Sequence, residues 1–255
     1  MESSNNFANY RLFLDLDSTN LEAKRLAEEN HDELWILAQN QRRGRGRRGK
    51  QWLSGNKNFT ASFLNYCSLP HSKILFKNYV AGIALYDSVL AAGVDGSDLT
   101  IKWPNDILLK KKKLGGVLIE ILSSTAENKT PLAVGFGLNL VSYPCANELS
   151  ATSLPATSLN SVVDDVPSPE EFLKILMDKY NFWDEKLNDI GFKVIIAEFL
   201  DRSLPIGKEI LLNINEKTIE GTFYGINDYG ALLLKTKSEL MVVSGGDVSL
   251  IEEQI

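Results

Sequence analysis

The chain has 255 residues, 44% of them hydrophobic, and a formal net charge of −6 at pH 7. This length suits one large domain, or a medium domain with a small appendage, and the acidic balance argues against general nucleic-acid binding. No basic segment followed by an apolar run opens the sequence and no apolar stretch approaches membrane-spanning length, so we expect a cytoplasmic protein without membrane contact. The two cysteines, Cys67 and Cys145, lack metal-ligand spacing, and we expect both thiols to be buried in a protein of a reducing compartment.

The first half of the chain alternates helical and extended patterns rather than repeating a unit. A helix is expected over 17–30, where Thr19 and Glu22 have the spacing of a capping box. Apolar and alternating patterns predict a strand on each side of the loop 44–52. Further along, the apolar stripe of 71–92 predicts a long helix. Short strands are then expected at 99–103, 106–109, 114–122 and 131–140.

The second half begins with helical patterns over 168–202 and then changes character. Pro205 marks a boundary, after which closely spaced short strands are typical of a small barrel of the SH3-like type. We therefore expect two domains, 1–204 and 205–255. The predicted fold is α+β, with a mixed central β-sheet flanked by helices and a small C-terminal β-barrel.

The loop 44–52 reads GRGRRGKQW, and its glycines at 44, 46 and 49 have the spacing of a dinucleotide-binding fingerprint. That fingerprint lies between a strand and a helix, whereas this loop leads into a second strand, so a dinucleotide site is excluded. Glycines let a backbone approach a ligand closely, and arginines offer paired donors to anionic oxygens. Trp52 adds a face on which a nucleobase can stack. A solvated surface loop is the alternative that the loop by itself leaves open.

Five motifs follow one another along the chain: DSTN at 17–20, GRGRRGKQW at 44–52, KWPNDILL at 102–109, KLGGVLIE at 113–120 and GFGLN at 135–139. This succession resembles the catalytic domain of the biotin protein ligases, also called holocarboxylase synthetases. The C-terminal segments YGINDYGALLL and GGDVSL resemble the small β-domain of that family. The resemblance implies a class II aminoacyl-tRNA synthetase/biotin synthetase-like fold.

The resemblance also implies an activity. Such ligases use ATP with Mg²⁺ to activate biotin as biotinyl-5′-AMP, and then transfer biotin to a lysine of the biotin carboxyl carrier domain of a carboxylase. The chain resembles the short form without an N-terminal DNA-binding domain, so we expect no nucleic-acid partner. Both a monomer and a homodimer are compatible with the sequence.

Site residues are assigned by the same resemblance. Lys113, Arg47 and Asp106 are the expected catalytic residues, with Asp106 binding Mg²⁺ or orienting the lysine. The residues expected to bind biotin are Ser18, Thr19, Asn20, Gln41, Gly44, Arg45, Arg47, Lys113, Gly115 and Gly116. Those expected to bind ATP are Arg45, Arg47, Lys50, Trp52, Asn105 and Asn139.

Each local pattern also has a purely structural interpretation. The DSTN segment can be a helix cap, the two glycines of KLGG can serve tight sheet packing, and Asn105 with Asp106 can form a turn after Pro104. Lys50 stands where the family commonly has arginine, which keeps the charge but loses the two-pronged donor.

Three other functions compete with biotin ligation. A lipoate or octanoate protein ligase shares the catalytic architecture, although the GRGR loop followed by Trp52 favours biotin. A nucleic-acid-binding module would use the basic loop and the aromatic side chains to grip phosphates and bases, and a steep salt dependence of its affinity would identify it. A sensor that binds biotinyl-AMP without transferring it is the third, and Lys113 and Asp106 argue against it.

Overall fold

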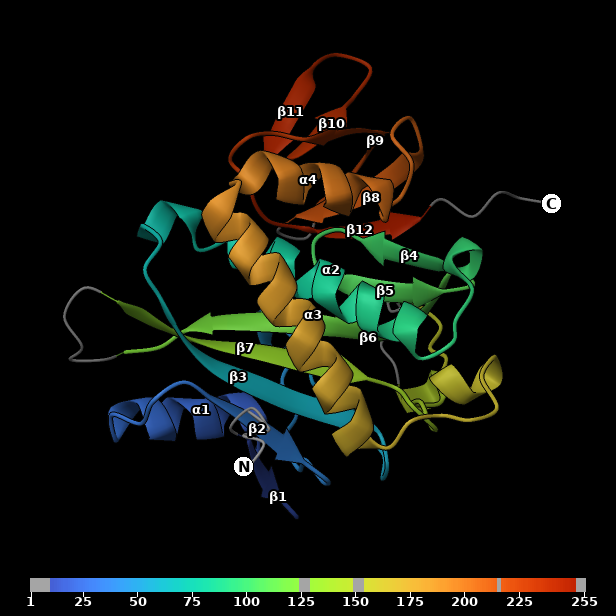
Figure 1. The fold of residues 1–255 in the computed structure, drawn as a ribbon. Coiled ribbons are helices and arrows are strands. Elements are labelled where there is room, and N and C mark those ends of the chain that lie inside the picture. The colour runs from blue at the N-terminus through green and yellow to red at the C-terminus, as the bar shows by residue number, and fades with distance from the viewer. Residues whose placement is uncertain (1–9, 124–128, 149–153, 215–216, 251–255) are drawn as a thin grey trace.

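The computed structural model describes residues 10–123, 129–148, 154–214 and 217–250, so the first nine residues, where no secretory signal is expected, lie outside it (Figure 1). The strands of the central sheet are β1 Tyr10–Phe13, β2 Leu34–Ala38, β3 Phe59–Cys67, β4 Leu99–Lys102, β5 Asp106–Leu109, β6 Lys112–Ile121 and β7 Thr130–Leu138. The α-helices are α1 Thr19–Glu28, α2 Phe76–Ala91, α3 Pro169–Asp189 and α4 Phe192–Asp201.

The central sheet is mixed, with the strand order β1-β2-β3-β7-β6-β5-β4. Strands β1 and β2 pair in parallel, and every other neighbouring pair is antiparallel. Every residue of β2 is buried, and successive side chains of a strand point to opposite faces, so β2 contributes apolar side chains to the cores on both faces of the sheet. Trp35 and Leu37 join the larger hydrophobic core, whereas Leu34, Ile36 and Ala38 join a smaller one.

The helices cover the two faces unequally. Helices α2 and α3 pack on the face of the larger core, as Figure 1 shows, and α1 packs on the other face against β2, β3 and β7. Contrary to the expectation that no apolar stretch approaches membrane-spanning length, the segment His71–Ala91 is long and apolar enough to span a membrane by length and composition, but most of it is buried inside the protein. A buried core helix also meets these criteria of length and composition, and this segment packs in the larger hydrophobic core.

The face that carries α1 is hollowed beyond the helix because several strand positions there lack large side chains. In β7 the residues that point to this face are Ala133, Gly135 and Gly137, and in β3 the neighbour of Gly135 is Ser62. A Cβ atom on Gly135 would lie 2.2 Å from Asn20 Oδ1, and one on Gly137 would lie 2.5 Å from the Trp52 ring. The glycines of the GFG motif therefore make room for side chains that come from elsewhere in the chain.

The C-terminal part is a second, five-stranded antiparallel sheet in the order β11-β10-β9-β8-β12. Its strands are β8 Glu209–Ile214, β9 Lys217–Ile226, β10 Leu232–Lys235, β11 Leu240–Val243 and β12 Asp247–Leu250. This sheet packs beside α2 and α4, where the Tyr79 hydroxyl donates to the carbonyl of Gly230 at 2.6 Å. The architecture is the α+β arrangement that the sequence predicts, and the domain boundary at 204/205 stays a prediction.

Two local expectations are wrong. Thr19 is the first residue of α1 rather than its cap, since Ser18 occupies the cap position and makes no side-chain capping bond. The Thr19 side chain bonds within the tertiary structure instead, as described below. Of the cysteines, Cys67 is buried as expected but Cys145 is exposed, because it lies in an irregular segment outside the core.

Candidate active site

One cavity of about 680 Å³ lies on the hollowed face of the central sheet, between the loop 44–52 and the C-terminal sheet. All the site residues predicted from the sequence line it except Gly44 and Gly115. Residues from both sheets contribute to its wall, with Asp247, Val248 and Ser249 coming from β12. The five motifs, which lie far apart in the sequence, therefore meet at one concave site.

The polar end of the cavity is lined by Thr19, Asn20 and Gln41, which are backed by the fully buried Ser62. The β1–β2 pairing positions this end. That parallel pairing continues past the strands as an isolated bridge between Leu16 and Gln41, which brings Gln41 beside the start of α1. Gln41 Oε1 accepts hydrogen bonds from the Thr19 backbone N–H at 2.9 Å and from Thr19 Oγ1 at 3.2 Å. The side chain of Gln41 is thus held in one orientation.

Ser62 ties the polar end to the sheet. Its fully buried Oγ lies 2.7 Å from Thr19 Oγ1 and 2.6 Å from Asn20 Oδ1. The amide nitrogen of Asn20 in turn donates to Glu120 Oε2 at 2.8 Å, and the other oxygen of Glu120 lies 3.0 Å from Arg45. Neutral donors and acceptors at fixed positions suit a compact polar ligand group.

The basic loop is a small closed hairpin. Arg45 and Gln51 form an antiparallel bridge, Gly46 N–H donates to the carbonyl of Lys50 at 2.7 Å, and Trp52 N–H donates to the carbonyl of Gly44 at 2.9 Å. A Cβ atom on Gly44 would lie 2.2 Å from the Trp52 carbonyl oxygen, so this glycine closes the hairpin rather than lining the cavity.

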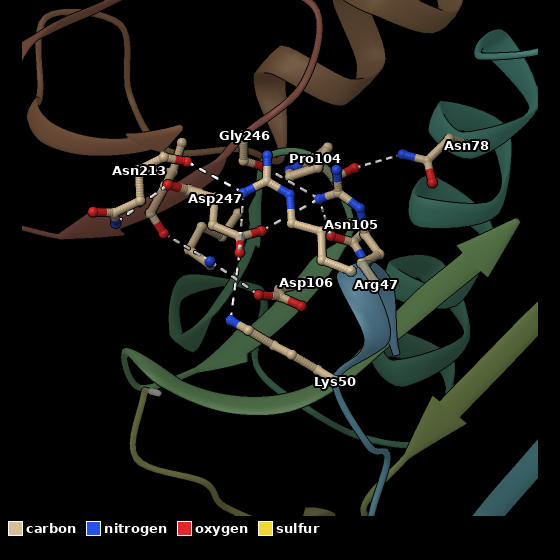
Figure 2. Close-up of polar contacts among 12 residues, drawn as sticks. Arg47, Lys50, Asn78, Pro104, Asn105, Asp106, Asn213, Gly246 and Asp247 are labelled. Atoms are coloured by element: carbon tan, nitrogen blue, oxygen red, sulfur yellow. Dashed lines mark hydrogen bonds and ion pairs between the residues drawn. The ribbon is translucent and has the colours of Figure 1, made fainter. Parts of the chain in front are cut away.

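The basic end of the cavity is lined by Arg47, Lys50 and Asp247, and it joins this hairpin to the C-terminal sheet. Figure 2 shows Arg47 and Lys50 reaching toward the carboxylate of Asp247, at 3.6 Å and 3.4 Å respectively, and Arg48 lies 3.9 Å from it. Arg47 also donates to Asn105 Oδ1 at 3.2 Å and to the carbonyl of Gly246 at 3.3 Å. Burial lowers the pKa of the Arg47 guanidinium, and Asp247 opposes that shift. Three cations around one carboxylate leave excess positive charge for an anionic ligand.

Between the two ends, Asp106 lies between two lysines. Its Oδ1 is 2.6 Å from Lys113 Nζ and its Oδ2 is 2.9 Å from Lys102 Nζ. Burial of the carboxylate opposes its ionisation, but the Lys113 and Lys102 ammonium groups outweigh burial and hold the pKa of Asp106 below its usual range. Asp106 therefore stays a carboxylate with each oxygen directed at a cation.

Asn105, Asn139 and Trp52 make up the remaining wall. Asn105 lies in the turn after Pro104, where its N–H donates to the Lys102 carbonyl at 3.1 Å, and its side-chain Nδ2 donates to the carbonyl of Val117 in β6 at 2.6 Å. Asn139 Nδ2 donates to the carbonyl of Thr157 at 2.9 Å, while its buried Oδ1 has no partner among the described residues. The Trp52 ring covers Gly137, and Lys113 Nζ lies 5.8 Å from its centroid.

The two glycines of KLGG have different roles. A Cβ atom on Gly115 would lie 2.6 Å from the carbonyl oxygen of Gly137, which supports the sheet-packing interpretation for this residue. Gly116 faces the cavity, where a Cβ atom would lie 3.2 Å from Asp106 Oδ1.

The residues that were not predicted from the sequence include Lys102 and Asp247, which line the cavity, and Arg48, Ser62 and Glu120, which contact residues that line it. Ser62 gives a partial signal, because it is a polar residue on the alternating strand 59–67. Lys102 and Asp247 lie within the quoted KWPND and GGDVSL motifs, but no local pattern indicates their partners.

Two protein-family models and several known proteins match this chain. The biotin/lipoate A/B protein ligase family matches residues 12–139, and the biotin protein ligase C terminal domain matches residues 206–251. A biotin–[acetyl-CoA-carboxylase] ligase of Paracoccus denitrificans is 34% identical over 232 residues, which are 91% of this chain and 96% of that protein. A bifunctional ligase/repressor of Bacillus spizizenii is 30% identical over 244 residues, 92% of this chain and 72% of that protein.

A solved structure shares the same architecture. Biotin protein ligase from Aquifex aeolicus, in complex with biotin and ATP, matches with a TM-score of 0.79 at 26% identity, over 97% of this chain and 100% of that one. The match spans both sheets and confirms the predicted fold class.

Proposed function

Because this chain belongs to the biotin/lipoate A/B protein ligase family, we propose that its cavity carries out both half-reactions of ATP-dependent biotin ligation. Biotin is activated as biotinyl-5′-AMP, and the biotinyl group then passes to a lysine of a biotin carboxyl carrier domain. The observation that carries this assignment is the convergence of a neutral polar end, a basic end and Lys113 in one cavity. The resemblance noted in the sequence is confirmed by the relatives.

The first half-reaction brings two anions together. A biotin carboxylate oxygen attacks the α-phosphorus of ATP, a new O–P bond forms, and pyrophosphate leaves with the electrons of the broken O–P bond. Cations held in place beforehand offset the repulsion between carboxylate and triphosphate and keep the reacting atoms in line. Arg45, Arg47 and Lys113 are the groups proposed to do this, and Asp106, 2.6 Å from Lys113 Nζ, would hold Lys113 in position for it.

The second half-reaction transfers the acyl group. The amine of the acceptor lysine attacks the biotinyl carbonyl, an amide forms, and AMP leaves with the former carboxylate oxygen. Activation is required because a free carboxylate is a poor electrophile, whereas its adenylate has a good leaving group. Lys113, which lines the cavity, is proposed to stabilise the charge that develops in this step as well.

The polar end is proposed to hold the ureido head of biotin. That head presents one carbonyl acceptor and two N–H donors, and Thr19, Asn20 and Gln41 present a matching set of donors and acceptors. A ligand without this head could not make these hydrogen bonds, which weakens its binding. Ser18 and Gly116 also line the cavity.

The nucleotide is proposed to occupy the basic end and the wall near Asn139. Lys50 and Arg47 would contact phosphates, and Trp52 would stack on adenine. Asn139 Oδ1 supports this placement, because a buried acceptor without a protein partner suits the exocyclic amino group of a purine. Asn105 holds Arg47 toward the phosphates.

Magnesium is expected to accompany ATP, and it usually binds one or two carboxylates together with substrate phosphates. No group of three His, Cys, Asp or Glu side chains among the described residues could hold a metal ion. Both oxygens of Asp106 face lysines, which favours its role in orienting Lys113 over a role as a metal ligand. We propose that Mg²⁺ enters with ATP and is held chiefly by its phosphates.

The acceptor is proposed to be the carrier domain of a biotin-dependent carboxylase, met in the cytoplasm. The relative from Paracoccus denitrificans carries acetyl-CoA-carboxylase in its name. A purified carrier domain should gain the mass of one biotinyl group in the presence of the enzyme, biotin and ATP.

The direct test of the activity uses the purified protein with ATP, Mg²⁺ and either biotin, lipoate or octanoate. Biotinyl-5′-AMP is expected by mass spectrometry in the biotin reaction alone, and Lys113→Ala should form it at least about 100-fold more slowly. An adenylate formed only from lipoate or octanoate would assign the chain to the other branch of its family. No adenylate with any acid would overturn the proposal.

A further inference from the structure

Lys102 is a buried cation for which the reaction described above has no role. It is the last residue of β4, and its side chain is only 6% exposed. Its ammonium contacts two groups from different sheets: Asp106 Oδ2 at 2.9 Å and the backbone carbonyl of Val248 at 2.8 Å. A buried ammonium requires such partners, because burying a charge without them is very costly.

Lys102, Asp106 and Lys113 form a charged cluster, and its net charge depends on Lys102. Without it, Asp106 and Lys113 would form a neutral pair, and the carboxylate would compete with biotin and phosphate for the Lys113 ammonium. With it, two lysines share one carboxylate, each on its own oxygen, and the cluster keeps a net charge of +1. Lys113, whose side chain is 34% exposed, is the member that can direct this charge into the cavity.

The second contact of Lys102 connects the cluster to the C-terminal sheet. Val248 follows Asp247 in β12, and Asp247 is the carboxylate that gathers the cations of the basic end. Strand β12 therefore contacts both sets of cations in the cavity. Asp247 pairs with the cations of the loop, and the Val248 carbonyl accepts a hydrogen bond from Lys102, which pairs with Asp106.

We propose that Lys102 is a positioning residue for adenylation, which holds Asp106 so that Lys113 points at the reacting carboxylate and α-phosphate, and which couples that orientation to the seating of β12. The inference rests on the proposed function, since adenylation is the step in which two anions meet. It assigns Lys102 no contact with substrate. Lys102 acts through Asp106, and this dependence gives it a measurable signature.

The test measures adenylation kcat and the KM values for biotin and ATP in Lys102→Met. Because a displacement of about 1 Å in a positioning group can lower a rate about 100-fold, we expect kcat to fall about 30- to 100-fold and both KM values to change less than about fivefold. Asp106→Asn should show a similar loss. The variant with both substitutions should be no slower than the slower single variant, because the two residues act as one unit.

Lys77→Met is the matched control for removing a buried lysine. Lys77 is as buried as Lys102 and pairs with Asp184 between α2 and α3, away from the cavity. Its loss should lower the melting temperature and leave adenylation kcat within about twofold of the wild type. A merely structural role for Lys102 predicts that Lys102→Met behaves in the same way.

If Lys102→Met does not fold, the same measurements are made on Lys102→Arg. Arginine keeps the charge, but its planar fork does not replace a compact ammonium between Asp106 and the Val248 carbonyl, so kcat should fall about three- to tenfold with the melting temperature preserved. Wild-type kcat in a folded Lys102 variant, or additive losses with Asp106→Asn, would overturn the inference and leave the ligase function standing. A wild-type protein that forms no biotinyl-AMP would overturn both.

Discussion

At the polar end of the cavity, Ser62 lies within 2.7 Å of both Thr19 and Asn20, buried between α1 and the central sheet. At the basic end, three cations lie 3.4 to 3.9 Å from the single carboxylate of Asp247, partly exposed and shared between a loop and the other sheet. Short buried bonds fix the first arrangement, whereas long and exposed ion pairs of this kind contribute only about 0–1 kcal/mol each. The polar end is therefore ordered before a ligand binds. At the basic end, an anionic substrate can replace the Asp247 carboxylate as the partner of the cations.

The largest effect that tests this difference between the polar and the basic end is expected from Gly135→Ala. The added Cβ would lie 2.2 Å from Asn20 Oδ1, so Asn20 or the strand must move, and displacement of a fixed binding group should raise the KM for biotin about 100-fold. The KM for ATP should change far less. Gly245→Ala is the matched control, because a Cβ there meets nothing within 4 Å. Wild-type biotin affinity in Gly135→Ala would mean that the polar end adapts as readily as the basic end.

Ser62→Ala removes one hydroxyl from the same end. Buried groups of Thr19 and Asn20 then lose a partner, at a cost of about 1–3 kcal/mol, so we expect the KM for biotin to rise about tenfold with the KM for ATP unchanged. Thr60→Val is the control, since the Thr60 hydroxyl bonds the Ala38 carbonyl outside the cavity. An equal rise in both KM values would show that Ser62 supports the whole site rather than the polar end.

Asp247→Asn probes the basic end. Losing the carboxylate releases the hairpin cations from β12, and because each ion pair is long and partly exposed, the KM for ATP should rise only about threefold. The KM for biotin should stay constant. Asp228→Asn, an exposed acid in the turn between β9 and β10, is the matched control. A rise well above tenfold would mean that the basic end is as firmly fixed as the polar end.

The smallest effect is expected from pH. The pKa of Asp106 is depressed in the folded protein, so its contribution to stability is fully present above the unfolded pKa of about 3.9 and is lost as the pH falls through the folded value. Between pH 5 and 8 the stability difference between the wild type and Asp106→Asn, measured by urea unfolding, should therefore stay constant. A difference that shrinks between about pH 7 and 5 would contradict the depressed pKa.

The parts of the site that are contiguous in the sequence were predictable, and the parts that depend on pairing between distant segments were not. The DSTN segment, the arginine loop and KLGG each carry a local signature, and the strands on both sides of the loop follow from their alternation. Asp247 was part of a quoted motif, yet its position beside Arg47 arises from the packing of two sheets whose residues are 200 positions apart. No local pattern encodes that packing.

The wrong capping prediction has the same cause. Thr19 has the spacing of a capping residue, but the bridge between Leu16 and Gln41 brings a tertiary partner to its hydroxyl, and the tertiary bonds replace the cap. Gly115 pairs with Leu138 in the sheet register, and a Cβ atom on it would lie 2.6 Å from the carbonyl oxygen of Gly137. Close packing therefore accounts for this glycine, and its role in binding biotin stays a prediction.

The position of Trp52 also has an optical consequence. The chain has four tryptophans, and Trp35, Trp103 and Trp183 are buried in the main core, where a ligand in the cavity does not reach them. Trp52 lines the cavity itself, with the Lys113 ammonium 5.8 Å from its ring centroid. A nucleotide that stacks on this indole, or moves the lysine, alters the surroundings of one fluorophore out of four. The protein therefore contains its own emission probe for titrating the cavity, and Trp52→Phe supplies the blank.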